Sequence, residues 1–83
     1  MNTLEDVKHL LDHALQLGGR ASAMQADSPL LGALPELDSM AVVNVIASLE
    51  EHFGISVLDD DINADTFATL GSLAAFVDSK LAA

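Results

Sequence analysis

The sequence contains no cysteine, and this absence excludes disulfide bonds, thiolate nucleophiles and thiolate metal sites. Aromatic side chains are nearly as scarce, with three phenylalanines and no tyrosine or tryptophan. The hydrophobic 51% of the 83 residues is therefore mainly leucine, valine, isoleucine and alanine, a composition that suits packed helices. A chain of this length can bury one modest core, so we expect a single domain over residues 1–83.

Basic side chains are also few, since Lys8, Arg20 and Lys80 face thirteen acidic residues and leave a net charge of −10. This charge repels nucleic acids and anionic membranes, so neither is an expected partner, whereas basic protein surfaces are attracted. No stretch has the apolar length of a membrane span, and the residues after Met1 do not read as a secretory leader. We therefore expect a cytoplasmic, monomeric protein.

Apolar residues recur at helical spacing in three segments, over about residues 3–17, 39–52 and 70–81. A shorter helix is expected at 64–68, in the connection between the second and third segments. Residues 20–37 form a long loop between the first two main helices, and its four leucines should pack against them. This layout predicts an all-α fold, a small four-helix bundle of three main helices and one short helix.

Polar and glycine residues mark where these helices should begin and end. Thr3 and Thr69 are expected N-caps of the first and last helices, while Gly18-Gly19 and Gly54 should end the first and second. A serine before an apolar helical run is also a common helix start, so Ser39 is first of all an N-cap candidate.

Two patterns resemble metal sites without meeting their requirements. Residues 59–65 carry oxygen ligands at alternate positions, as a calcium loop does, but Ala64 replaces the required glycine and the closing acid is absent. His9 and His13 are four residues apart, with Asp6 on the same face, but they lack the glutamate of a metalloprotease helix. We interpret the first pattern as an acidic helix start and the second as a solvated polar face, and expect no metal site.

Catalysis by Ser39 would need a base within hydrogen-bond reach. The histidine on the same predicted helix is His52, which lies about 20 Å away along the axis at 1.5 Å per residue. The Gly-x-Ser-x-Gly turn of serine hydrolases is also absent. We therefore do not expect Ser39 to act as a self-sufficient nucleophile.

Ser39 nevertheless has features beyond those of a cap. A helix N-terminus stabilises an attached phosphate, and the neighbouring carboxylate of Asp38 can hold a basic partner or a metal ion. The front of the helix carries no charge over its first turns, where a solvent-exposed helix usually has ion pairs. The side chains there are small or medium-sized and apolar: Met40, Ala41, Val43 and Ala47.

The segment DSMAVVNVIASLEEHFGISV, residues 38–57, resembles the recognition helix of acyl carrier proteins, whose hallmark is Asp-Ser-Leu at the start of the second helix. The likeness covers essentially the whole chain. A leading amphipathic helix, a long leucine-bearing loop, the Phe53-Gly54-Ile55 turn, the acidic run at 59–61 and a closing helix from Thr69 follow in family order.

The resemblance implies that Ser39 carries 4′-phosphopantetheine, which a phosphopantetheinyl transferase moves from coenzyme A. The thiol of this group would hold an acyl group as a thioester, for use by acyl-transfer or acyl-ligase enzymes with basic patches. The inner face of the helix would shelter part of the acyl chain near Val43 and Ala47. The implied docking residues are Glu36, Asp38, Met40, Val43, Ala47, Glu50 and Glu51.

Some positions depart from the family pattern. Met40 stands where leucine is usual, and Ala41 and Asn44 stand where fatty-acid carriers have acids. With fewer charges, docking should depend more on apolar fit. The pattern therefore favours a specialised, stand-alone carrier of a dedicated lipid or secondary pathway over a general fatty-acid carrier. The alternatives are an aminoacyl or peptidyl carrier of a nonribosomal pathway, an unmodified acidic helical adaptor that binds a basic partner, and a weak binder of divalent cations.

Overall fold

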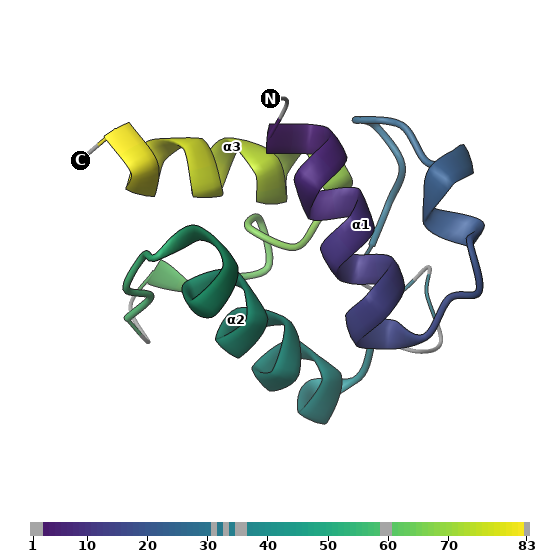
Figure 1. Ribbon diagram of the computed structural model, residues 1–83, viewed down its shortest axis with the longest axis horizontal. Helices are drawn as coiled ribbons and strands as arrows, with labels where there is room; N and C mark the ends of the chain where they lie inside the picture. Colours follow the sequence, from purple (N-terminus) through teal and green to yellow (C-terminus); the bar gives the residue numbers. More distant parts are fainter. Residues whose placement is uncertain (1–2, 31, 33, 35–36, 59–60, 83) are drawn as a thin grey trace.

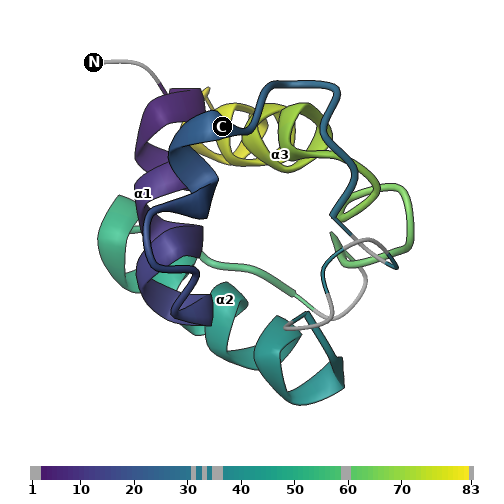
Figure 2. The same ribbon diagram turned by 90° about the vertical axis from the view of Figure 1, so that its right-hand side faces the viewer.

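The computed structural model of the chain describes residues 3–30, 32, 34, 37–58 and 61–82. Its elements are the helices α1 (Thr3–Leu15), α2 (Ser39–Phe53) and α3 (Leu70–Ala82), with a short 3₁₀ helix η1 (Arg20–Ala23) after α1. Helix α1 packs against both other helices, and η1 lies beside α1 (Figures 1 and 2). Among the described residues the only β-type pairing is one isolated bridge, so the predicted all-α class is confirmed.

One hydrophobic core joins the three helices, because each turns a row of side chains three or four residues apart toward the others. The loop between α1 and α2 contributes to this core, as its leucines predicted, since Leu30 is fully buried and Leu37 is nearly so. None of the helices in the described part of the chain is long and apolar enough to cross a membrane. The largest fully buried side chains are Val7, Leu11, Leu30, Val45, Leu49, Leu70, Leu73 and Val77.

Helix α1 ends earlier than its glycine pair predicts. The residue after the helix, Gln16, has a positive φ of 54°, and the N–H of Leu17 donates to the carbonyl of Asp12 at 2.9 Å. This is a Schellman-type ending with a glutamine at the position that glycine usually occupies. The chain turns there because Leu17 is buried, so the stop predicted at Gly18-Gly19 is displaced to Leu15.

Thr69 caps α3, as predicted. Its Oγ1 accepts the N–H of Ser72 at 3.0 Å, and the Oγ of Ser72 accepts the N–H of Thr69 at 3.0 Å. Both groups would otherwise lack a partner at the helix start, so the pair acts as a reciprocal cap. Thr3 differs, because it is the first residue of α1 and its hydroxyl donates to Asp78 of α3.

The short helix predicted at 64–68 is replaced by turns. The N–H of Thr66 donates to both the carbonyl and the side-chain oxygen of Asn63, and the N–H of Ala68 donates to Asp65. These bonds span three residues rather than four, because the Asn63 side chain competes for the backbone donor that would begin a helix. In the described chain, the short helical element is the 3₁₀ helix η1 instead.

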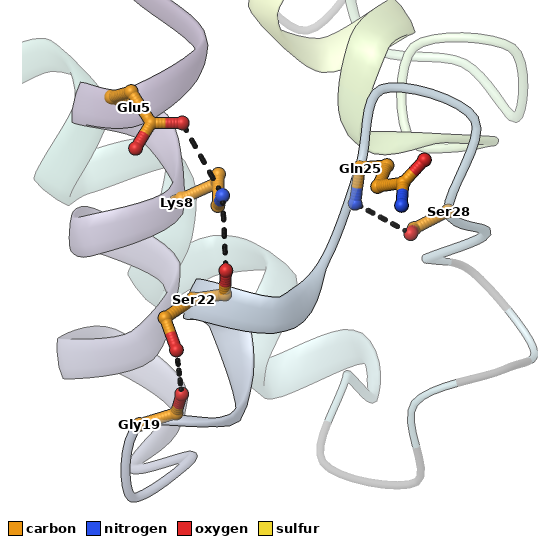
Figure 3. A network of polar contacts seen from close by, with 6 residues as sticks. All are labelled: Glu5, Lys8, Gly19, Ser22, Gln25 and Ser28. Carbon is orange, nitrogen blue, oxygen red and sulfur yellow. Dashed lines mark hydrogen bonds and ion pairs between the residues drawn. The ribbon is translucent and has the colours of Figure 1, made fainter.

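The first part of the long loop is held to α1 by polar contacts (Figure 3). The ammonium group of Lys8 lies 3.2 Å from the Glu5 carboxylate and 3.3 Å from the Ser22 carbonyl. Further along, the N–H of Gln25 donates to the Ser28 hydroxyl at 2.8 Å, which closes a turn. The loop therefore follows a defined path from η1 toward α3.

The same loop supplies acceptors for the first N–H groups of α3. The N–H of Leu70 donates to the Ser28 carbonyl at 2.9 Å, and that of Gly71 donates to the Ala26 carbonyl at 2.7 Å. A Cβ atom on residue 71 would lie 2.8 Å from that Ala26 oxygen. Only glycine lets the loop and the helix approach this closely.

We expect Gly71→Ala to destabilise the protein although alanine favours helices by about 1 kcal/mol over glycine. The clash with Ala26 should outweigh that gain and lower the free energy of unfolding by roughly 1 kcal/mol, measured by urea denaturation. Ser79→Ala, at an exposed position of the same helix, is the control and should change stability by less than about 0.5 kcal/mol. Equal stability of Gly71→Ala and the parent would contradict the close contact.

Candidate functional site

Asp38, and not Ser39, is the N-cap of α2. Its backbone is extended, with φ −99° and ψ −176°, and its Oδ1 accepts the N–H of Ala41 at 2.8 Å. Ser39 is the first helical residue, so the interpretation of this serine as the cap is wrong. The two residues are adjacent and both types are favoured at N-caps, which is why the sequence could not separate them.

The Ser39 side chain is exposed on a well-anchored backbone. Two residues earlier, Leu37 is buried in the core and its N–H donates to the Leu34 carbonyl at 3.0 Å. On the other side, the first helical bond of α2 joins the N–H of Val42 to the Asp38 carbonyl at 2.9 Å. No described residue forms a hydrogen bond with the Ser39 hydroxyl, which is therefore free to react.

The start of α2 favours an anion bound to Ser39. The Asp38 carboxylate takes one N–H group, that of Ala41, while the N–H groups of Ser39 and Met40 have no acceptor among the described residues. Free N–H groups and the positive end of the helix dipole stabilise a phosphate attached there. The arrangement can thus hold a phosphate ester on the serine.

The histidines lie elsewhere. They line a groove of about 810 Å³ between α1 and α2, beside the C-terminal half of α2. Figure 2 shows that end of α2 beside α1 and the start of α2 directed away from it. In the described structure Ser39 therefore has no imidazole base, as its spacing from His52 predicted. The groove residues are Asp6, His9, Leu10, His13, Ser48, Glu51 and His52.

Four of the predicted docking residues form one exposed stripe along α2. Met40 and Val43 keep 72% and 61% of their surface exposed, and Ala47 and Glu51 follow at helical spacing and are also exposed. Apolar side chains that are exposed next to one another are typical of an interaction surface. The stripe begins one residue after Ser39, so a protein that covers it would also reach the serine.

The other predicted docking residues differ from this stripe. Glu50 is half-buried, and its carboxylate accepts the N–H of Val57 at 2.8 Å, which ties α2 to the following connection. Asp38 is exposed but serves as the cap. Glu36 lies outside the described residues. The sequence did not predict that Asp38 and Glu50 accept backbone N–H groups within the fold, because the sequence of an acidic residue's neighbours does not tell which donor it will bind.

The predicted shelter for an acyl chain is wrong in its residues. Val43 and Ala47 face solvent, whereas the side chains of α2 that enter the core are Val45 and Leu49. The apolar run of α2 has no charged residue to distinguish the two faces, so its periodicity left the inward side ambiguous. Val43 and Ala47 are therefore available to a partner and not to an internal chain.

In the acidic run before α3, the described acid Asp61 binds other groups of the fold. The Asp61 carboxylate lies 2.6 Å from the Lys80 ammonium group and accepts the N–H of Leu58 at 3.0 Å. The hydrogen bond from Lys80, followed by that from Leu58, lowers the pKa of Asp61 below its ordinary value. The Asn63 side chain is taken by Thr66. The two residues at 59–60 lie outside the described range.

Comparison with known proteins finds a matching family model and matching solved structures. A family model described as "Phosphopantetheine attachment site" matches residues 8–77. The solution NMR structure of a holo acyl carrier protein from Nitrosomonas europaea is 58% identical, covers the whole of both chains and superposes with a TM-score of 0.93. A search of curated proteins found no match.

The cap assignment predicts different effects for two neighbouring substitutions. Asp38→Ala should lower the free energy of unfolding by about 1 kcal/mol, because the N–H of Ala41 loses its acceptor. Ser39→Ala should change it by less than about 0.5 kcal/mol, because the serine side chain has no partner. Asp38→Asn keeps an acceptor oxygen and is the control. Urea denaturation measures all three, and a larger loss in Ser39→Ala would show that the serine is the cap.

Proposed function

Because this chain belongs to the acyl carrier protein family, we propose that it bears its 4′-phosphopantetheine on Ser39 and serves a dedicated lipid or secondary pathway. A member of this family is a carrier and not an enzyme, and the group is covalently attached. An unmodified adaptor is therefore no longer an alternative. A cytoplasmic location and a monomeric state stay predictions.

The observation that carries the assignment is the free hydroxyl at the start of α2. Seven serines are present in the sequence, and three have hydroxyls bound within the fold: Ser22, Ser28 and Ser72. Ser48 and Ser79 lie within the bodies of helices, and Ser56 lies in the connection after α2. Ser39 alone combines exposure with the N-terminus of a long helix, so its surroundings fit a phosphodiester best.

The residues around Ser39 have distinct roles in this proposal. The free N–H groups of Ser39 and Met40 and the helix dipole stabilise the phosphate, while Asp38 keeps the helix start in place. When bound, the group supplies a thiol that holds an acyl chain as a thioester. The phosphopantetheinyl transferase must supply the base for attachment, since the histidines of this chain line the α1–α2 groove.

The docking stripe supports a specialised role. We assign partner contact to the exposed apolar side chains of Met40, Val43 and Ala47, with Glu51 at the end of the stripe. The net charge of −10 attracts enzymes with basic patches, and the apolar side chains select among them by fit. The 58% identity to an acyl carrier supports an acyl cargo over an aminoacyl or peptidyl one.

Attachment to Ser39 is tested by mass. Purified unmodified protein, incubated with coenzyme A and a broad-specificity phosphopantetheinyl transferase, should gain the mass of one phosphopantetheinyl group. Ser39→Ala should gain none, because the nucleophilic oxygen is gone. Ser48→Ala, within the same helix, is the matched control and should be modified fully. Modification of Ser39→Ala, or its loss in Ser48→Ala, would disprove the assignment.

The docking stripe is tested with the same transferase as the partner. Met40→Ala should lower kcat/KM for modification about tenfold, because it removes an exposed apolar contact next to the reacting serine. Leu81→Ala removes an exposed leucine from α3, outside the stripe, and should leave kcat/KM unchanged. Equal effects of the two substitutions would contradict a docking role of the stripe.

A further inference from the structure

The groove between α1 and α2 gathers all three histidines of the protein. His9 and His13 come from α1, and His52 comes from α2. Two acids, Asp6 and Glu51, line the same groove. Five of its lining side chains are thus of types that bind metal ions, and they lie away from the proposed attachment serine.

These five side chains are not used by the fold. None of them forms a hydrogen bond or ion pair with another described residue. The His52 ring packs edge-on against the ring of Phe53. Other acids of the protein do bind within the fold, since Asp12 accepts the N–H groups of Gly19 and Ala21. The groove therefore holds free ligand groups on two well-packed helices.

The spacing of His9 and His13 suits chelation. Residues four apart on an α-helix lie on one face with Cβ atoms about 5–6 Å apart. Two imidazole nitrogens can then reach one ion at about 2.0–2.1 Å, as the two histidines of zinc-binding helices do. Both side chains are exposed, so their rings are free to turn toward a shared ion.

We propose that His9 and His13 form a two-histidine site for a late first-row divalent ion such as Zn²⁺. Imidazole selects Zn²⁺, Ni²⁺ or Cu²⁺ over Mg²⁺ and Ca²⁺, which prefer oxygen ligands. Asp6, one turn earlier, adds a negative charge that favours the bound cation. The described chain has no group of three or more histidine or acidic side chains that could hold a metal ion, so the proposed site has two protein ligands and water would complete the shell.

Zn²⁺ titration of the full-length Ser39→Ala protein tests this site. This protein has no thiol that could compete for the metal, because the chain lacks cysteine and the attachment oxygen is removed. NMR signals of the His9 and His13 rings should shift together in one saturable step, while Mg²⁺ at the same concentration should leave them unchanged. His13→Ala in the same background should weaken Zn²⁺ binding at least about tenfold, because it breaks the chelate.

His52→Ala is the matched control, since it removes an exposed histidine of the same groove from the other helix. It should keep the Zn²⁺ affinity within about threefold. The proposal fails if His13→Ala binds Zn²⁺ as well as the parent, or if His52→Ala loses as much affinity as His13→Ala. Circular dichroism confirms that each variant is folded. Because the experiment uses Ser39→Ala, its result is independent of the proposed attachment site.

Discussion

The burial of Leu37 determines where the rest of the site stands. This side chain is in the core, while Asp38 and Ser39, the next two residues, are exposed. Because Leu37 is buried and Asp38 is exposed, the chain leaves the core between these two residues. The Asp38 carboxylate then caps the start of α2 by accepting the N–H of Ala41. The core contact of Leu37 and the Asp38 cap together place the Ser39 hydroxyl in solvent.

The described acidic residues include two contrasting groups. Asp12, Asp38, Glu50 and Asp61 each accept backbone N–H groups and hold connections or helix ends in place. Others, such as Glu51, project into solvent without a partner in the described chain. Only the second group is fully available for basic partner surfaces. The hydrogen-bonded acids keep their charge and still contribute to the long-range field of the net charge of −10, but direct ion pairs with a partner are left mainly to the second group.

Periodicity was enough to predict the main helices, the packed loop and a serine at the start of α2. Local details were harder to predict, because they depend on which of several competent groups finds a partner. Asn63 binds Thr66 and prevents the helix expected at 64–68, and the burial of Leu17 ends α1 before its glycines. The inward face of α2 was ambiguous because its apolar residues surround the helix, and only packing shows that Val45 is inside and Val43 outside.

The distance between Ser39 and the histidines has a consequence for the cargo. An imidazole beside the serine could also activate a water molecule, which would then attack any thioester carried nearby. In the described structure, the imidazoles line a groove beside the C-terminal half of α2, whereas Ser39 lies at its N-terminus. If the proposed tether is attached to Ser39, no described imidazole lies beside its point of attachment, so a base acting there would have to come from a partner protein.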